Sequence, residues 1–214
     1  MKVYESDAAA EKEILSWWKK NKYYLAIVVL GVIMIASTFM NIKQYRENLN
    51  IKIATIFYHI VPGLMLENNE AAIKQVSDLK LYHPNSVYTT LSSLITAKYY
   101  VNKKEYEKAI EQYNWVINHN KNDFRSMAEL KIARIYIQLD KADEAIKILQ
   151  KEHIFKAEKT MILGDAYTKL KDLTKAKASY AEGMKVCDKK YETSLCDVLA
   201  MKYNNINYVA AAKS

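Results

Sequence analysis

Three stretches of sequence decide the fold: residues 97–113 read AKYYVNKKEYEKAIEQY, residues 133–149 read ARIYIQLDKADEAIKIL, and residues 164–180 read GDAYTKLKDLTKAKASY. Each begins with a small residue, followed by tyrosine three positions later, alanine twelve positions later and a large apolar or aromatic side chain four positions after that alanine. The shared offsets indicate one structural unit repeated three times. The matching residues are Ala97, Tyr100, Ala109 and Tyr113; Ala133, Tyr136, Ala145 and Leu149; and Gly164, Tyr167, Ala176 and Tyr180.

A unit with these offsets resembles a tetratricopeptide repeat, which has about 34 residues in two antiparallel helices. The small residues let the two helices of a unit approach closely, and the large ones fill the space between neighbouring units. Turns between paired helices are expected at residues 102–104, 140–141 and 171–172. The pattern predicts an all-α solenoid with three repeats over residues 86–189.

Two further helical segments are expected to flank the repeats. Over residues 41–85 we expect a stalk helix and a degenerate repeat, because apolar residues recur at intervals of three and four from Ile42 to Ile60. Pro62-Gly63 should kink or end the stalk helix, and residues 69–80 should form the next one. Residues 190–214 should hold a closing helix near 194–204 and a C-terminal tail, since terminal repeats need a cap.

Before the stalk lies an apolar run. Residues 23–40 read YYLAIVVLGVIMIASTFM, eighteen residues without a charge. A helix rises about 1.5 Å per residue, so this run nearly crosses a hydrocarbon core of roughly 30 Å. Trp17 and Trp18 precede it, and aromatic rings of this kind favour the headgroup region. The run predicts an uncleaved transmembrane helix continuing into the stalk, with residues 1–22 as a cytoplasmic tail.

The basic residues on either side of this run predict its orientation. Lys19, Lys20 and Lys22 precede the run closely, whereas Lys43 and Arg46 follow it. The bias places the N-terminus in the cytoplasm and the larger C-terminal part across the membrane, which in a bacterium is the periplasm.

The composition favours helices and excludes several classes of function. Only four glycines and two prolines occur among 214 residues, so glycine-rich phosphate loops and strand-rich folds are disfavoured. The net charge of +8 comes from lysines interleaved with acidic residues, as in a solvated helical surface. Nucleic-acid binding is not expected, because the sequence has no arginine-rich run and no aromatic-basic motif.

Short motifs lie along the anchor, the repeats and the closing segment: Trp17-Trp18-Lys19-Lys20-Asn21, Ser86-Val87-Tyr88, Lys108-Ala109-Ile110, Trp115-Val116, Ala133-Arg134-Ile135, Asp143-Glu144-Ala145, Gly164-Asp165-Ala166 and Met201-Lys202-Tyr203-Asn204-Asn205. With these motifs, the order of the parts resembles the YfgM-like family, whose members are ancillary subunits of the bacterial SecYEG translocon. The resemblance implies partnership with the translocon and with a membrane-anchored periplasmic chaperone of the peptidyl-prolyl isomerase kind, and a role in passing nascent secreted chains onward.

The candidate binding surface is the concave face of the repeat stack, which the first helix of each pair lines. It is expected to have an apolar floor with a few charges, suited to an apolar helix or an extended segment of a partner. The alternative is that the same apolar residues pack inside the stack. The predicted face consists of Leu91, Leu94, Lys98, Val101, Met127, Leu130, Arg134, Ile137 and Met161.

Cys187 and Cys196 are the two cysteines, and they bracket the turn before the closing helix. In an oxidising compartment they could form a disulfide that pins this helix; two independent buried thiols are the alternative. The four histidines lie far apart in the sequence. No nucleophilic triad, paired catalytic carboxylates or metal-ligand spacing can be identified, so we expect a binding protein without a cofactor, not an enzyme.

Two other functions fit the same pattern. The domain could be a scaffold for envelope assembly or cell division, using the same concave face. Alternatively, the cytoplasmic tail could tether a soluble regulator to the membrane.

Overall fold

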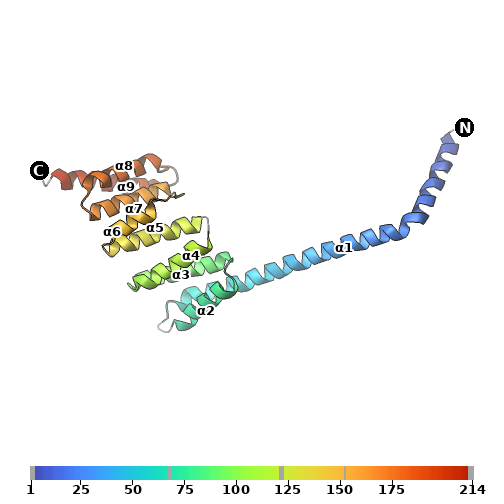
Figure 1. Cartoon of the computed structure of the whole chain (residues 1–214), viewed down its shortest axis with the longest axis horizontal. Coiled ribbons are helices and arrows are strands. Elements are labelled where there is room, and N and C mark those ends of the chain that lie inside the picture. Colours follow the sequence, from blue (N-terminus) through green and yellow to red (C-terminus); the bar gives the residue numbers. More distant parts are fainter. Residues whose placement is uncertain (1–2, 67–68, 121–122, 152, 212–214) are drawn as a thin grey trace. The chain divides into compact units, whose positions relative to one another are not determined.

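The computed structural model describes residues 3–66, 69–120, 123–151 and 153–211, and the regular elements in these ranges are all α-helices. The all-α class predicted from the sequence is therefore confirmed. The chain divides into two compact units, residues 1–52 and 53–214. Helix α1, Val3–Gly63, contributes to both units (Figure 1).

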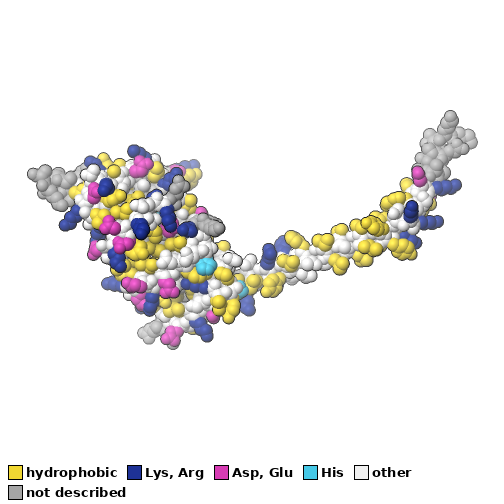
Figure 2. Space-filling view, viewed as in Figure 1, with side chains coloured by type: hydrophobic (Ala, Val, Ile, Leu, Met, Phe, Trp, Pro, Cys, Tyr) yellow, Lys and Arg dark blue, Asp and Glu magenta, His cyan; other side chains and the backbone are white. Residues whose placement is uncertain are grey.

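In the first unit, α1 has an exposed apolar segment. It is the one helix in the described part of the chain that is long and apolar enough to cross a membrane, and none of its most apolar window is buried. Figure 2 shows hydrophobic side chains along this part of α1. The hydroxyls of Ser37 and Thr38 donate to the carbonyls of Ile33 and Met34, each at 2.8 Å. These hydroxyls therefore have partners within the helix itself, as an apolar environment requires.

In the second unit, the last turns of α1 pack against α2, Glu70–Tyr82. Ile60 and Leu64, at this end of α1 and just after it, are buried. Helix α1 ends at Gly63, directly after Pro62, as the sequence predicts. A Cβ atom on Gly63 would lie 2.9 Å from the Cβ of Ala72, so glycine permits the close approach of the two segments.

Three pairs of helices follow. Neighbouring helices contact each other in chain order, and the first helices of successive pairs also contact each other, which places α3, α5 and α7 on one face of the stack (Figure 1). The pairs are α3 (Val87–Asn102) with α4 (Tyr106–His119), α5 (Asp123–Gln138) with α6 (Ala142–Leu149), and α7 (Lys156–Lys169) with α8 (Leu173–Val186).

The turn inside each pair has the same conformation. Lys104, Asp140 and Lys171 have φ angles of 60°, 58° and 62°, in the left-handed region. In each turn the next residue donates its backbone N–H to the carbonyl of the repeat tyrosine, as Glu105 does to Tyr100 at 2.9 Å. This pair of features is the Schellman motif, which satisfies carbonyls at a helix C-terminus. The turns lie where the sequence predicts them.

The repeat residues form the core. The side chains of Ala97 and Ala133 are fully buried, and the backbone of Gly164 is buried as well. Each of the three lies where the two helices of a pair meet. At the third position the packing is tightest, because a Cβ atom on Gly164 would lie 2.3 Å from the Cε1 atom of Tyr180. Tyr180 itself is 3% exposed. These contacts join the two helices of each repeat into one layer.

Helix α9, Thr193–Ala211, closes the stack. Its Leu199 is buried against α7 and α8. The Lys202 ammonium and the Tyr180 hydroxyl both donate to one carboxylate oxygen of Asp165, at 2.6 Å and 2.7 Å. Residues from the two distant motifs Gly164-Asp165-Ala166 and Met201-Lys202-Tyr203 thus meet in space.

A disulfide links Cys187, which caps the C-terminus of α8, to Cys196 in the first turn of α9. Their Cα atoms are 5.8 Å apart. The bond attaches the start of the closing helix to the last repeat. Of the two alternatives left open by the sequence, the structure has the bonded one.

Candidate partner-binding surface

The predicted concave face is centred on a groove between α3 and α5. Five of the nine predicted residues line one cavity of about 470 Å³. Leu94, Lys98 and Val101 come from α3, and Met127 and Arg134 come from α5. These residues share the cavity because α3 and α5 are the first helices of adjacent pairs and lie next to each other.

The structure differs from the prediction at Leu130 and Met161. Leu130 is 1% exposed and packs with Leu149 and Ile162, at the junction of the second and third repeats. Met161 is 7% exposed and packs beneath Leu199 of the closing helix. Both are packing residues in this structure, because a neighbouring helix covers the face on which they lie. Leu91 and Ile137 are half-buried and lie outside the cavity.

The groove also includes residues outside the predicted face. Ile95 and Asn102 of α3 line it, as do Lys131 and Gln138 of α5. Lys131 lies four residues after Met127, and this helical spacing was the signal that could have identified it. Arg134 reaches across to α7, where its guanidinium lies 2.8 Å from the Glu158 carboxylate.

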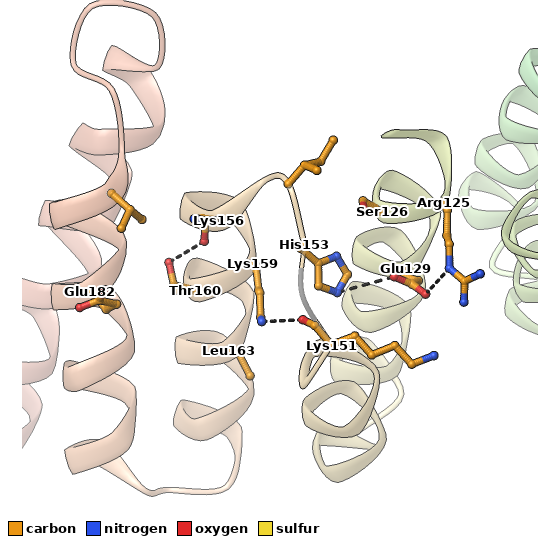
Figure 3. A pocket seen from close by; sticks show the side chains of 12 residues that line it. Arg125, Ser126, Glu129, Lys151, His153, Lys156, Lys159, Thr160, Leu163 and Glu182 are labelled. Atoms are coloured by element: carbon orange, nitrogen blue, oxygen red, sulfur yellow. Dashed lines mark hydrogen bonds and ion pairs between the residues drawn. The ribbon is translucent and has the colours of Figure 1, made fainter. Parts of the chain in front are cut away.

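A second cavity, of about 720 Å³, lies between α5, α7 and the connection after α6 (Figure 3). Its wall holds a buried ionisable pair: His153 Nε2 lies 3.7 Å from the carboxylate of Glu129, and both side chains are almost fully buried. Arg125 contacts the same carboxylate at 3.2 Å. Figure 3 shows the imidazole turned toward Glu129, with Arg125 on the other side of the carboxylate.

The surroundings of His153 oppose its protonation. Burial lowers the pKa of His153 below its ordinary value, and the nearby Lys159 and Lys151 act in the same direction. Glu129 and a backbone hydrogen bond act against this shift. The imidazole is therefore neutral near pH 7, and the pair joins α5 to the α6–α7 connection.

The residues that line the cavities show which kinds of ligand they could contact. Across the described ranges, no group of three or more His, Cys, Asp or Glu side chains is arranged to hold a metal ion. The groove between α3 and α5 combines aliphatic side chains with cations at its edge, which is an arrangement suited to a polypeptide.

The chain is similar to a known protein family and to two named bacterial proteins. Residues 15–208 match the family model described as a tetratricopeptide repeat-like domain. The chain is 30% identical over 188 residues to a protein of Buchnera aphidicola subsp. Schizaphis graminum named Ancillary SecYEG translocon subunit, covering 86% of this chain and 93% of that protein. It is 25% identical over 212 residues to the Escherichia coli K12 protein of the same name, covering 97% of this chain and 100% of that protein. No solved structure matches the chain significantly.

Proposed function

Since the chain belongs to the YfgM-like family of tetratricopeptide-repeat proteins, we propose that it is an ancillary subunit of the SecYEG translocon that acts by binding other proteins. Both relatives described above bear the name of such a subunit and align over most of their length. A binding role accords with the cavities, which offer apolar and basic side chains to a polypeptide.

The main support for the proposal is the combination of two features in one chain. The same chain holds a helix that is long and apolar enough to cross a membrane and a repeat domain with an open groove on its inner face. A protein built in this way keeps a peptide-binding surface at the membrane, where exported chains emerge from a translocon. The local concentration of a partner in the same membrane is then high, so modest affinity is sufficient.

We further propose a single-pass topology in the bacterial inner membrane, with residues 1–22 cytoplasmic, residues 23–40 in the membrane and the remainder periplasmic. The excess of lysines before the apolar run supports this orientation. The disulfide between Cys187 and Cys196 supports it independently, because disulfides persist in the periplasm and are rare in the cytoplasm.

The proposed partners are the SecYEG translocon and a membrane-anchored periplasmic chaperone of the peptidyl-prolyl isomerase kind. In this scheme the repeat domain helps transfer nascent secreted chains from the translocon to the chaperone. We place this contact on the groove between α3 and α5, since aliphatic side chains line it together with cations that a polypeptide can contact.

Affinity purification of the full chain from membranes in mild detergent tests the proposal. We expect the translocon subunits and a chaperone to co-purify, and a chain lacking residues 1–15 to retain both. Recovery of cell-division or cell-wall proteins without translocon subunits would favour a scaffold. Loss of function on deleting residues 1–15 would favour a tether for a cytoplasmic regulator.

A further inference from the structure

The groove between α3 and α5 continues into another cavity. A space of about 610 Å³ lies between the end of α1, the segment that follows it, and α3. Ile95, Lys98 and Asn102 line both this space and the 470 Å³ cavity. The two cavities therefore adjoin along α3 and form one surface, which we call the basic groove.

The floor of the basic groove is aliphatic and partly exposed. Leu94, Ile95 and Val101 on α3 are half-buried, and Met127 faces them from α5. Met65, at the α1 end, is 80% exposed. Methionine side chains are flexible and adapt to different apolar partners, so the two ends of the groove can receive large side chains of varied shape.

The charges of the basic groove have one sign. Among the described residues that line the two cavities, Lys98, Lys103, Lys131 and Arg134 are cationic and none is acidic. Arg134 pairs with Glu158, but no described carboxylate lies within ion-pair distance of Lys98, Lys103 or Lys131. Some lysines elsewhere on the repeats do pair with acids, as Lys169 does with Asp140 and Lys175 with Asp172, both at 2.9 Å. The groove thus holds cations that this chain does not neutralise.

We propose that the basic groove binds an acidic, amphipathic segment of a partner protein, with apolar side chains entering the two cavities and carboxylates contacting Lys98, Lys103 and Lys131. The proposal rests on the proposed function only in assigning this face to partner binding. The aliphatic floor favours a polypeptide over a nucleic acid or a lipid headgroup, because neither of these presents large apolar side chains together with its negative charge.

Peptide binding to the full chain in nanodiscs of neutral lipid tests this specificity. The probes are synthetic peptides of about 15 residues, roughly four helical turns, with the same leucine stripe and with Glu, Gln or Lys at the other positions. We expect the Glu peptide to bind at least about tenfold more tightly than the Gln peptide, and its affinity to fall as salt is added. Equal affinity for the Glu and Gln peptides would overturn the proposal.

A matched pair of variants locates the contact. Lys98→Glu/Lys131→Glu should weaken binding of the Glu peptide about tenfold or more. Lys74→Glu/Lys147→Glu makes the same change in net charge on exposed residues outside the groove, and it should leave binding unchanged. Equal effects of the two variants would overturn the proposal. The full chain could instead bind anionic vesicles and not the Glu peptide, with only the groove variant losing the vesicle binding. That result would assign the groove to lipid and overturn the proposal.

This test is independent of the translocon assignment. If the Glu peptide binds as expected but translocon subunits do not co-purify with the full chain, the proposed function fails and the groove specificity stands. If the translocon co-purifies but the peptides do not discriminate by charge, the groove specificity fails alone.

Discussion

Gly164 illustrates how single residues set the spacing between helices. A Cβ atom there would lie 2.3 Å from the ring of Tyr180, which is itself fixed by Asp165 and Thr168. Gly164→Ala should lower the free energy of unfolding by about 1–3 kcal/mol, since overpacking outweighs the better helix propensity of alanine. Urea denaturation of the full chain in detergent, followed by circular dichroism, measures the change.

The control for this substitution is Gly31→Ala. A Cβ atom on Gly31 has no neighbour within 4 Å, so this variant should unfold at the same urea concentration as the original chain. Equal stability of the Gly164→Ala variant would show that the Tyr180 ring moves aside without cost.

His153 makes stability depend on pH. Its pKa is lowered in the folded chain, chiefly by burial, so the unfolded chain binds more protons as the pH falls below the ordinary histidine value. The contribution to stability is full above that value and is lost as the pH falls toward the folded pKa. We expect the urea midpoint to drop between about pH 7 and pH 5, where unperturbed histidine gains its proton.

His153→Gln should reduce this drop, because the variant has no proton to gain at that position. His119 is exposed and stacks on Trp115, so His119→Gln provides the control and should keep the full pH dependence. An unchanged pH profile in His153→Gln would assign the dependence to other groups.

At the scale of elements, the three turns carry a conformational cost. Lys171 has a φ angle of 62°, which costs an L-residue roughly 1–2 kcal/mol. Lys171→Gly should therefore raise the free energy of unfolding by about 0.5–1 kcal/mol, after the larger chain entropy of glycine is deducted. Lys103, which has a φ angle of −80°, is the control: Lys103→Gly should lower stability. A Lys103→Gly variant that is more stable to urea than Lys171→Gly would show that the left-handed turn residue carries no such cost.

The closing helix depends on its disulfide. Cys187 and Cys196 are separated by 9 positions, and a loop of this size stabilises the folded chain by roughly 2–3 kcal/mol in the chain-entropy model. The double variant Cys187→Ser/Cys196→Ser should lose about this much in urea denaturation. In chains taken from membranes, maleimide should label the cysteines only after reduction. Labelling without reduction would contradict both the bond and the proposed periplasmic location.

Much of this element structure could be predicted from sequence, because the repeat signal is local. Positions such as Ala133 and Tyr136 lie within one turn of each other, and the adjacent Pro62-Gly63 pair marks the end of α1 in the sequence itself. The exposure of a helix face could not be predicted in the same way. Leu130 fits the inner-face pattern as well as Met127 does, yet it is buried because it faces Leu149 and Ile162 of neighbouring helices. Likewise, no local pattern connects Glu129 with His153.

At the scale of the whole molecule, the chain combines a helix that is long and apolar enough to cross a membrane with a tetratricopeptide repeat-like domain. The family membership and the helix order were predicted from the sequence, because both depend on the order of the segments along the chain. The basic groove was only half predicted. Lys98 and Arg134 were included, whereas Lys103 and Lys131 emerged from the packing of α1, α3 and α5 around the two cavities.

The most direct test of the account is site-specific photo-crosslinking in intact inner membranes. The crosslinking residue replaces Tyr45, close to the membrane segment, or Lys98 in the basic groove, and Glu107 on α4 serves as an exposed control. We expect capture of a translocon subunit from Tyr45 and of a chaperone or a nascent secreted chain from Lys98, with neither captured from Glu107. Capture of cell-division or cell-wall proteins alone at both test positions would contradict it.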